Sequence, residues 1–183
     1  MLRENTEIEY KCLVSEIEYL SLLKHYTNQY QQIKQVNVYY RDFLNNLSNK
    51  QAIIRQRLLD DSSVLGFKIK VADKLLEYEI DSESLDNPGL LKVLSSYDIY
   101  PPFVKVGELL TIRRLIDLEN AELCLDENHY NNIVDFEIEY ELKNQKDDLS
   151  TFIDLLKSVD IIYQANHLSK YQRLLQSLEA ERL

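Results

Sequence analysis

Charged residues alternate with mostly apolar ones in five short segments of this chain, at positions 7–11, 55–57, 68–70, 77–79 and 135–141. Alternation with a period of two is typical of a β-strand that has one buried face and one polar face. Any half-buried strand shows this pattern, so one segment alone carries little information. Five of them, some acidic and some basic, indicate that several strands share one charged surface.

The same pattern, together with turn-forming residues, predicts the secondary structure. Strands are expected at 7–14, 35–40, 51–58, 64–71, 74–80, 104–116, 121–126 and 132–142. Helices are expected at 15–29, 82–97, 149–159 and 169–182, the second of them broken at 87–89 because a proline is followed there by a glycine. Ser15 is the predicted N-cap of the first helix. The apolar stripe of that helix is predicted to consist of Ile17, Leu20, Leu22, Leu23 and Tyr26.

These elements predict an antiparallel α+β domain. The gaps between strands are short, as in hairpins, and the chain lacks the regular strand–helix–strand order of parallel sheets. With 183 residues, one domain over 1–183 is the default. Helices would cover the apolar sides of the strands. If the sheet closes into a barrel, the charged sides line a polar lumen.

Composition narrows the class of protein. Hydrophobic residues make up 45% of the chain and charged residues 28%, as in ordinary soluble proteins. The longest apolar runs are too short for a membrane span, and the charged N-terminus does not resemble a signal peptide, so we expect a cytoplasmic protein without a membrane partner. The net charge of −10 argues against nucleic-acid binding. Two distant cysteines, without a CxxC spacing, and three scattered histidines give no indication of a zinc site.

The acidic segments are candidate metal ligands. Two glutamates at i and i+2 of a strand stand roughly 7 Å apart on one face, because each residue advances the strand by about 3.3 Å. Two such pairs facing each other would form an oxygen-rich pocket that suits Mg²⁺ or Mn²⁺. The alternative is a solvated strand face with cross-strand ion pairs.

The basic segments are candidate ligands for a polyanion, since arginine offers planar donor forks and lysine a compact charge. The residues in question are Arg55, Arg57, Lys68, Lys70 and Arg113. Together they would repel one another unless glutamates or a bound anion balance them, and a ladder of surface ion pairs is again the alternative. The chain has no P-loop sequence and no recognisable Ser–His–Asp or Cys–His grouping.

The acidic and basic motifs, taken in their order along the chain, resemble those of the CYTH domain of the triphosphate tunnel metalloenzyme superfamily. The resemblance is to the small bacterial single-domain group of that superfamily. Glu7-x-Glu9-x-Lys11 resembles the N-terminal ExExK motif of that family, and Asn37-Val-Tyr-Tyr its N-x-Y-[FY] strand. The remaining matches are Arg55-Gln-Arg57, Lys70, Glu77-Tyr-Glu79, Arg113, Asp126, the Glu137-Ile-Glu139 pair and Ser169-Lys170-Tyr171.

The resemblance implies that the strands form an eight-stranded antiparallel β-barrel, called a tunnel in this family. It also implies that the protein hydrolyses a triphosphate with the help of Mg²⁺ or Mn²⁺. It implies metal ligation by Glu7, Glu9, Asp126, Glu137 and Glu139. It implies substrate binding by Lys11, Arg55, Arg57, Lys70, Glu77, Glu79, Arg113 and Lys170. Glu9, Glu139 and Lys170 are the implied catalytic residues. The partner would be a small polyanion, inorganic triphosphate or a thiamine or nucleoside triphosphate, and the protein a monomer or homodimer.

Two alternatives share the same charged residues. An adenylate cyclase would direct the ribose 3′-hydroxyl of ATP at the α-phosphate, and a non-catalytic sensor would only bind polyphosphate or nucleotide. The chain also departs from the family pattern in two places. Arg41-Asp42 stands where Asp-Thr is usual, and Gln51 replaces a common turn glycine. Both departures lie outside the expected lining, so they bear on substrate access more than on metal binding.

Overall fold

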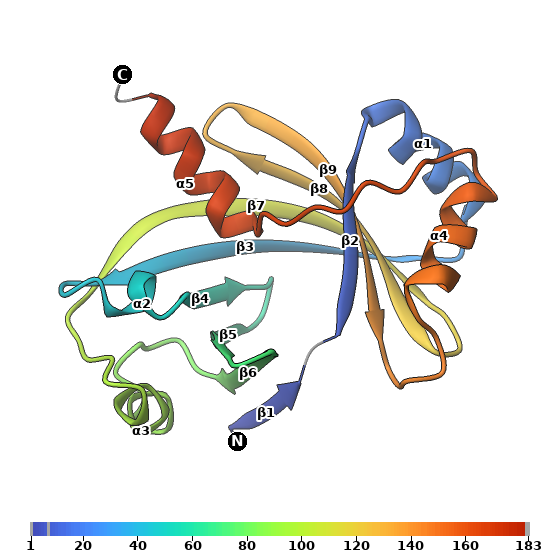
Figure 1. Cartoon of the computed structure of the whole chain (residues 1–183). Coiled ribbons are helices and arrows are strands. Elements are labelled where there is room, and N and C mark those ends of the chain that lie inside the picture. The colour runs from blue at the N-terminus through green and yellow to red at the C-terminus, as the bar shows by residue number, and fades with distance from the viewer. Residues whose placement is uncertain (1, 7, 182–183) are drawn as a thin grey trace. The chain divides into compact units, whose positions relative to one another are not determined.

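The computed structural model describes residues 2–6 and 8–181 and confirms the α+β class (Figure 1). The strands are β1 (Arg3–Thr6), β2 (Glu9–Val14), β3 (Gln31–Asp42), β4 (Ala52–Leu58), β5 (Ser63–Val71), β6 (Lys74–Asp81), β7 (Phe103–Asp117), β8 (Ala121–Tyr130) and β9 (Ile133–Leu142). The helices are α1 (Glu16–His25), α2 (Asn46–Asn49), α3 (Pro88–Ser96), α4 (Leu149–Lys157) and α5 (Lys170–Ala180). Glu7, a predicted metal ligand, lies outside the described residues.

The strands form an antiparallel sheet in the order β1-β6-β5-β4-β3-β7-β8-β9-β2. Within residues 2–6 and 8–181 the sheet has nine strands, whereas the sequence predicted eight. The additional strand is β1, whose four residues are all exposed and show no apolar alternation. The chain divides into two compact units. Of the described residues, the first unit contains 2–6 and 35–109, and the second unit contains 8–34 and 110–181.

The core of the first unit lies between one face of β4, β5 and β6 and the helices α2 and α3. Phe67 and Ile54 from the strands and Leu90 and Leu94 from α3 are fully buried there. α3 begins at Pro88, so the helix predicted over 82–97 was wrong over 82–87. Asn87 caps the helix by accepting hydrogen bonds from two backbone N–H groups, and proline is well suited to the first helical position.

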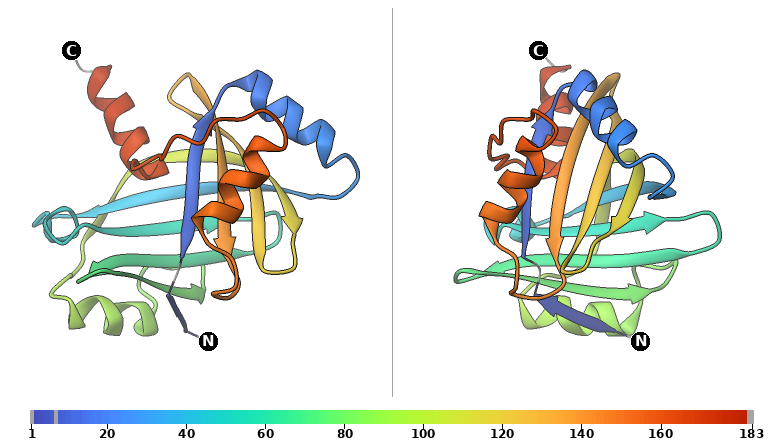
Figure 2. Two further views of the ribbon diagram at one scale, coloured as in Figure 1. Left: turned by 45° about the vertical axis from the view of Figure 1, so that its right-hand side comes forward. Right: turned by 90° about the vertical axis from the view of Figure 1, so that its right-hand side faces the viewer.

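The core of the second unit lies between β2, β8 and β9 on one side and α1 and α4 on the other (Figure 2). The predicted N-cap Ser15 is confirmed and forms a capping box with Glu18. The predicted stripe of α1 was partly wrong, because Ile17 and Leu20 are 82% and 53% exposed. Tyr19 and Leu22 are buried instead. Positions 19, 22, 23 and 26 follow the i, i+3, i+4, i+7 spacing of a single helix face, which residues 17 and 20 do not share.

A two-residue turn sets the register of β8 and β9, and with it the position of the acidic residues. Asn131 and Asn132 have φ values of 47° and 63°, which is the backbone of a type I′ hairpin turn. The turn pairs Tyr130 with Ile133 and, four residues further from the turn, Asp126 with Glu137. A shift of one residue in the register would turn every acidic side chain of β9 to the apolar face.

Among the described residues, no helix has the length and apolarity needed to cross a membrane.

Candidate functional site

Three acidic side chains converge on the polar face of the second unit. Asp126 on β8 is the direct cross-strand partner of Glu137 on β9, and Glu139 follows two residues later on the same face. One carboxylate oxygen from each lies within 4.8 Å of the other two. Asp126 and Glu137 are completely buried. Three of the predicted metal ligands are therefore brought together.

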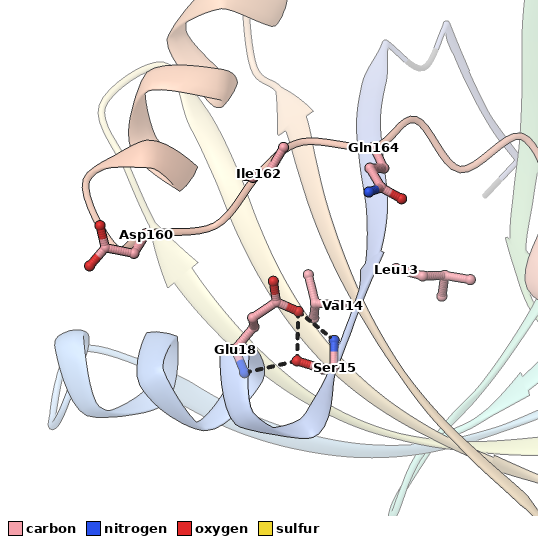
Figure 3. A pocket seen from close by; sticks show the side chains of 7 residues that line it. All are labelled: Leu13, Val14, Ser15, Glu18, Asp160, Ile162 and Gln164. Atoms are coloured by element: carbon pink, nitrogen blue, oxygen red, sulfur yellow. Dashed lines mark hydrogen bonds between the residues drawn. The ribbon is translucent and has the colours of Figure 1, made fainter.

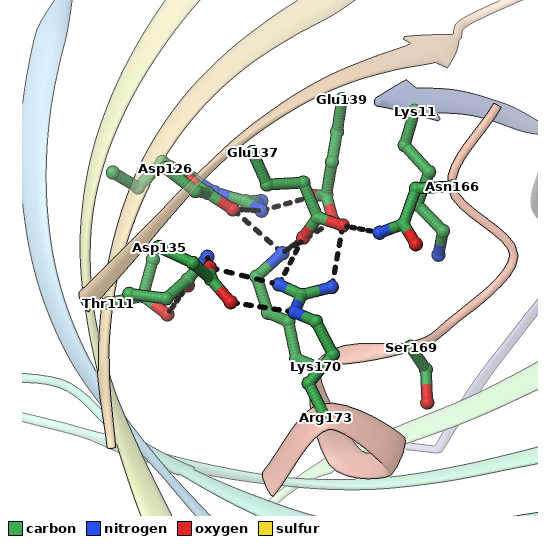
Figure 4. A network of polar contacts seen from close by, with 12 residues as sticks. Lys11, Thr111, Asp126, Asp135, Glu137, Glu139, Asn166, Ser169, Lys170 and Arg173 are labelled. Atoms are coloured by element: carbon green, nitrogen blue, oxygen red, sulfur yellow. Dashed lines mark hydrogen bonds and ion pairs between the residues drawn. The ribbon is translucent and has the colours of Figure 1, made fainter. Parts of the chain in front are cut away.

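Lys170 places its ammonium group among these three carboxylates (Figure 4). Its Nζ lies 2.9 Å from an oxygen of Asp126, 2.6 Å from Glu137 and 2.5 Å from Glu139. Ser169 caps α5, so Lys170 is the first residue of that helix. Burial disfavours the charged ammonium, but the surrounding carboxylates outweigh it and raise the pKa of Lys170 well above its ordinary value.

Arg113 on β7 joins the same group. Its guanidinium donates two hydrogen bonds to Asp126, at 2.8 and 2.6 Å, and one to Glu139 at 2.5 Å. Burial would raise the pKa of the Glu139 carboxyl, yet Lys170 and Arg113 together hold that pKa well below its usual range. Glu139 is consequently ionised, as a metal ligand must be.

A further layer of contacts, which the sequence did not reveal, fixes Glu137. The buried guanidinium of Arg173 bridges Glu137, at 2.9 Å, and Asp135, at 2.8 Å. Asn166 donates a hydrogen bond of 2.7 Å to Glu137. Arg173 lies three residues after Lys170, on the same face of α5. That spacing was the available indication of its role.

The donor set of this group fits a divalent metal of the Mg²⁺ or Mn²⁺ type. Such ions prefer carboxylate oxygens, and one or two carboxylates commonly suffice when phosphate oxygens complete the shell. The position already attracts a cation, because Lys170 contacts all three carboxylates. Lys170 and a metal bound by the same three oxygens would compete for one space, so the ammonium must withdraw before such an ion binds.

Glu9 and Lys11 lie on β2, at the edge of the same unit. They form an ion pair of 2.6 Å. Burial disfavours the charge of Lys11, but Glu9, Glu139 and Glu137 outweigh it and raise the pKa of its ammonium. Within the described part of the chain, the carboxylate group able to hold a metal contains Asp126, Glu137 and Glu139 but not Glu9. Metal ligation by Glu9 stays a prediction.

The polar face of the first unit carries the other predicted phosphate ligands. Arg55 lies 3.2 Å from Glu77 and 3.9 Å from Glu79, and Arg57 lies 3.8 Å from Glu79. The glutamates thus supply the counter-charge that neighbouring arginines require. Lys68 contacts Glu77 at 3.4 Å.

The two candidate lysines of β5 differ in their surroundings. Lys68 takes part in the charged group, whereas Lys70 is exposed near the end of the strand. Arg3 on β1 lies 3.8 Å from Glu79 and adds a cation. Arg3 was not predicted, because β1 lacks the alternating pattern of a strand.

A cavity of 410 Å³ lies elsewhere in the second unit (Figure 3). It is lined by Leu13, Val14, Ser15, Glu18, Asp160, Ile162 and Gln164. None of the predicted site residues lines it. The hydrogen bonds between Ser15 and Glu18 at its wall are those of the α1 cap. The cavity therefore has no part in the candidate site.

Comparisons with known proteins identify the family of this chain. The family model of the CYTH domain matches residues 5–173. A search of curated proteins gave no match.

Several solved structures share the fold. A Bacillus halodurans protein described as a candidate adenylate cyclase is 25% identical, with a TM-score of 0.80 over 93% of this chain and 97% of its own. A candidate adenylyl cyclase from Hippeastrum, described as having a dominant triphosphatase activity, is 22% identical, with a TM-score of 0.77 over 93% and 95%. The PH1819 protein of Pyrococcus horikoshii is 17% identical, with a TM-score of 0.67 over 93% and 98%.

Proposed function

The chain belongs to the CYTH domain family, and from that premise we propose that it is a divalent-metal-dependent triphosphatase. The observation that carries the proposal is that Asp126, Glu137 and Glu139 converge around one position, which the ammonium group of Lys170 occupies. A purely structural polar face would have no need of three buried or half-buried carboxylates at such short separations, because their mutual repulsion is costly without a cation.

Asp126, Glu137 and Glu139 would hold the metal, with Glu9 and Glu7 as further ligands. A divalent ion bound there would act as a Lewis acid toward phosphate oxygens. Arg113 donates hydrogen bonds to Asp126 and Glu139 and so keeps both carboxylates oriented. Lys170, once it leaves the carboxylates, offers its ammonium to a phosphate. The hydrolysis of phosphoric anhydrides depends mostly on positioning and charge stabilisation, which these residues supply.

The remaining cations would bind the phosphate chain. Arg55 and Arg57 present guanidinium forks that match phosphate oxygens, and Lys11 and Lys70 add point charges. Glu77 and Glu79 contact the two arginines and hold them in place before substrate arrives. A triphosphate would therefore meet cations that are already ordered, which lowers the entropy cost of binding.

Adenylate cyclase activity is the second candidate. A Bacillus halodurans structure and a Hippeastrum structure that share this fold are both described as candidate adenylate cyclases. We rank hydrolysis first because the charged groups account for binding a triphosphate, whereas no group that would recognise adenine is identified among the described residues. A non-catalytic sensor remains the third candidate.

A substrate screen decides among these candidates. Inorganic triphosphate, thiamine triphosphate and ATP would each be incubated with Mg²⁺ or Mn²⁺, and orthophosphate, pyrophosphate and cyclic AMP would be quantified. We expect orthophosphate release that depends on metal, without cyclic AMP. Formation of cyclic AMP and pyrophosphate at the rate of ATP loss would establish the cyclase. Binding without turnover of any compound would establish the sensor.

A further inference from the structure

Asn37 on β3 has a buried carboxamide whose oxygen lacks a partner. The residue is 1% exposed, and among the described residues nothing donates a hydrogen bond to its Oδ1. Buried polar groups in folded proteins are nearly always paired, because an unsatisfied acceptor loses its hydration without compensation. A buried acceptor without a partner therefore indicates a donor that comes from outside the chain.

The carboxamide stands beside the arginines of the first unit. Asn37 is the direct cross-strand partner of Arg57, and Tyr39 is that of Arg55. Directly opposed residues of an antiparallel pair have Cβ atoms about 4.5–5.5 Å apart and point to the same face. The side chain of Arg57 is 24% exposed, so a ligand can reach its guanidinium from solvent. An anion bound there would lie within reach of the Asn37 oxygen.

We infer that Asn37 determines ligand specificity by accepting a hydrogen bond from an O–H group of the anion that Arg57 binds. The inference rests on the proposed function. Fully ionised phosphate oxygens only accept hydrogen bonds, and so does an amide oxygen. The two repel each other unless one oxygen of the ligand carries a proton. That proton belongs either to a terminal phosphate, as P–OH, or to the organic part of the ligand, as C–OH.

Binding measurements on substituted proteins test this inference. Affinities for inorganic triphosphate, ATP and 2′,3′-dideoxy-ATP would be determined by calorimetry without divalent metal, together with the Tm of each protein. Asn37→Leu keeps the approximate volume of the side chain and removes the acceptor. We expect its Kd for at least one of these ligands to rise about tenfold, the effect of losing one hydrogen bond to a bound group. The Tm should stay unchanged or rise, because an unsatisfied buried acceptor is lost.

Gln56→Ala is the matched control. Gln56 lies on β4 with its amide on the opposite face, where it contacts Tyr40 at 2.9 Å, Ser63 at 3.1 Å and the Glu83 carbonyl at 3.0 Å. Loss of this amide should lower the Tm and leave ligand affinity unchanged. A structural residue and a ligand-binding residue thus give opposite results in the two measurements.

The ligands identify the source of the proton. Weaker binding of inorganic triphosphate by Asn37→Leu assigns the contact to P–OH. Weaker binding of ATP alone, with dideoxy-ATP unaffected, assigns it to C–OH. Unchanged affinity for all three ligands, or a fall in Tm like that of Gln56→Ala, overturns the inference while the proposed function stands. Failure of the unsubstituted protein to bind any of the three overturns both.

Discussion

Glu137 is a buried carboxylate of the candidate site that three other side chains hold in place. Lys170 and Arg173 both pair with it, and Asn166 donates a hydrogen bond, while the residue itself is completely buried. A buried carboxylate requires this compensation, since removing it from water costs several kcal/mol. The compensation comes from α5 and the segment before it. The acidic group and α5 therefore depend on each other.

Replacing Arg173 should show how much this dependence contributes to stability. Arg173→Met leaves Asp135 and Glu137 without their bridging cation, so we expect the free energy of unfolding to fall by about 3–5 kcal/mol. The free energy of unfolding would be measured by denaturation in urea. Lys157→Met is the matched control, because the ion pair of Lys157 with Asp154 is exposed and contributes at most about 1 kcal/mol.

A second variant distinguishes lost charge compensation from lost packing. Combining Arg173→Met with Asp135→Asn and Glu137→Gln removes the uncompensated negative charges, and most of the lost stability should return. An Arg173→Met protein as stable as the Lys157→Met control would show that the bridge contributes nothing to the fold.

Among the helices, α1 has a cap whose strength depends on pH. The Glu18 carboxylate accepts hydrogen bonds from the Ser15 backbone N–H, at 2.7 Å, and from its hydroxyl, at 2.6 Å. These bonds lower the pKa of Glu18 below its ordinary value of 4.5. A carboxyl with a depressed pKa in the folded state stabilises the fold above its unfolded pKa. That contribution disappears as the pH falls through the folded pKa.

We therefore expect Glu18→Gln to lose less stability on acidification than the unsubstituted protein, since glutamine keeps an acceptor and does not titrate. Unfolding free energies between about pH 7 and about pH 3 would be compared. Glu16→Gln removes a carboxylate from the same helical turn without touching the cap, and its acid profile should match the unsubstituted protein. Identical profiles for Glu18→Gln and Glu16→Gln would refute the role of the cap.

The link between α2 and β4 contains a strained residue. Gln51, which replaces a glycine common in the family, has a φ of 52°, a conformation that costs a residue with a side chain about 1–2 kcal/mol. Gln51→Gly should raise the free energy of unfolding by about 1 kcal/mol, after the greater flexibility of glycine in the unfolded chain is subtracted. Thermal unfolding would measure the change. Lys50→Gly, at a neighbouring φ of −94°, should instead destabilise. If both substitutions lowered the free energy of unfolding, the claim that Gln51 is strained would be contradicted.

Across the whole molecule, prediction from sequence succeeded where alternation of residues was strong. Alternation predicted that Glu137 and Glu139 share one face of a strand, and the resemblance added Asp126, which lies directly opposite Glu137 on the neighbouring strand. Prediction from sequence missed β1, whose residues are uniformly polar. It also missed the bridge from Arg173 to Glu137, which lie 36 positions apart. The helical spacing places Arg173 on the same face as Lys170 but does not show which strand residue that face contacts.

Ligand binding should stabilise the molecule as a whole. Tripolyphosphate at about 100 times its Kd, without divalent metal so that it is not hydrolysed, adds roughly 2.7 kcal/mol by mass action. For a chain of this length that corresponds to a rise in Tm of roughly 5–10 °C. Diphosphate should give a smaller rise, because it meets fewer cations, and Arg57→Ala should reduce the rise with tripolyphosphate. Equal stabilisation by tripolyphosphate and by sulfate at the same ionic strength would rule out a triphosphate site.

The most direct test of the central claim is phosphate release from inorganic triphosphate by Glu139→Gln. Glu139 contacts Lys170 and Arg113 and belongs to the group of carboxylates that would bind metal. We predict that the unsubstituted protein releases orthophosphate only with Mg²⁺ or Mn²⁺ and that Glu139→Gln, folded as judged by circular dichroism, loses this activity. Glu122→Gln, on the same strand pair but outside the group, should retain it. Full metal-dependent activity in folded Glu139→Gln would contradict the assignment of the site.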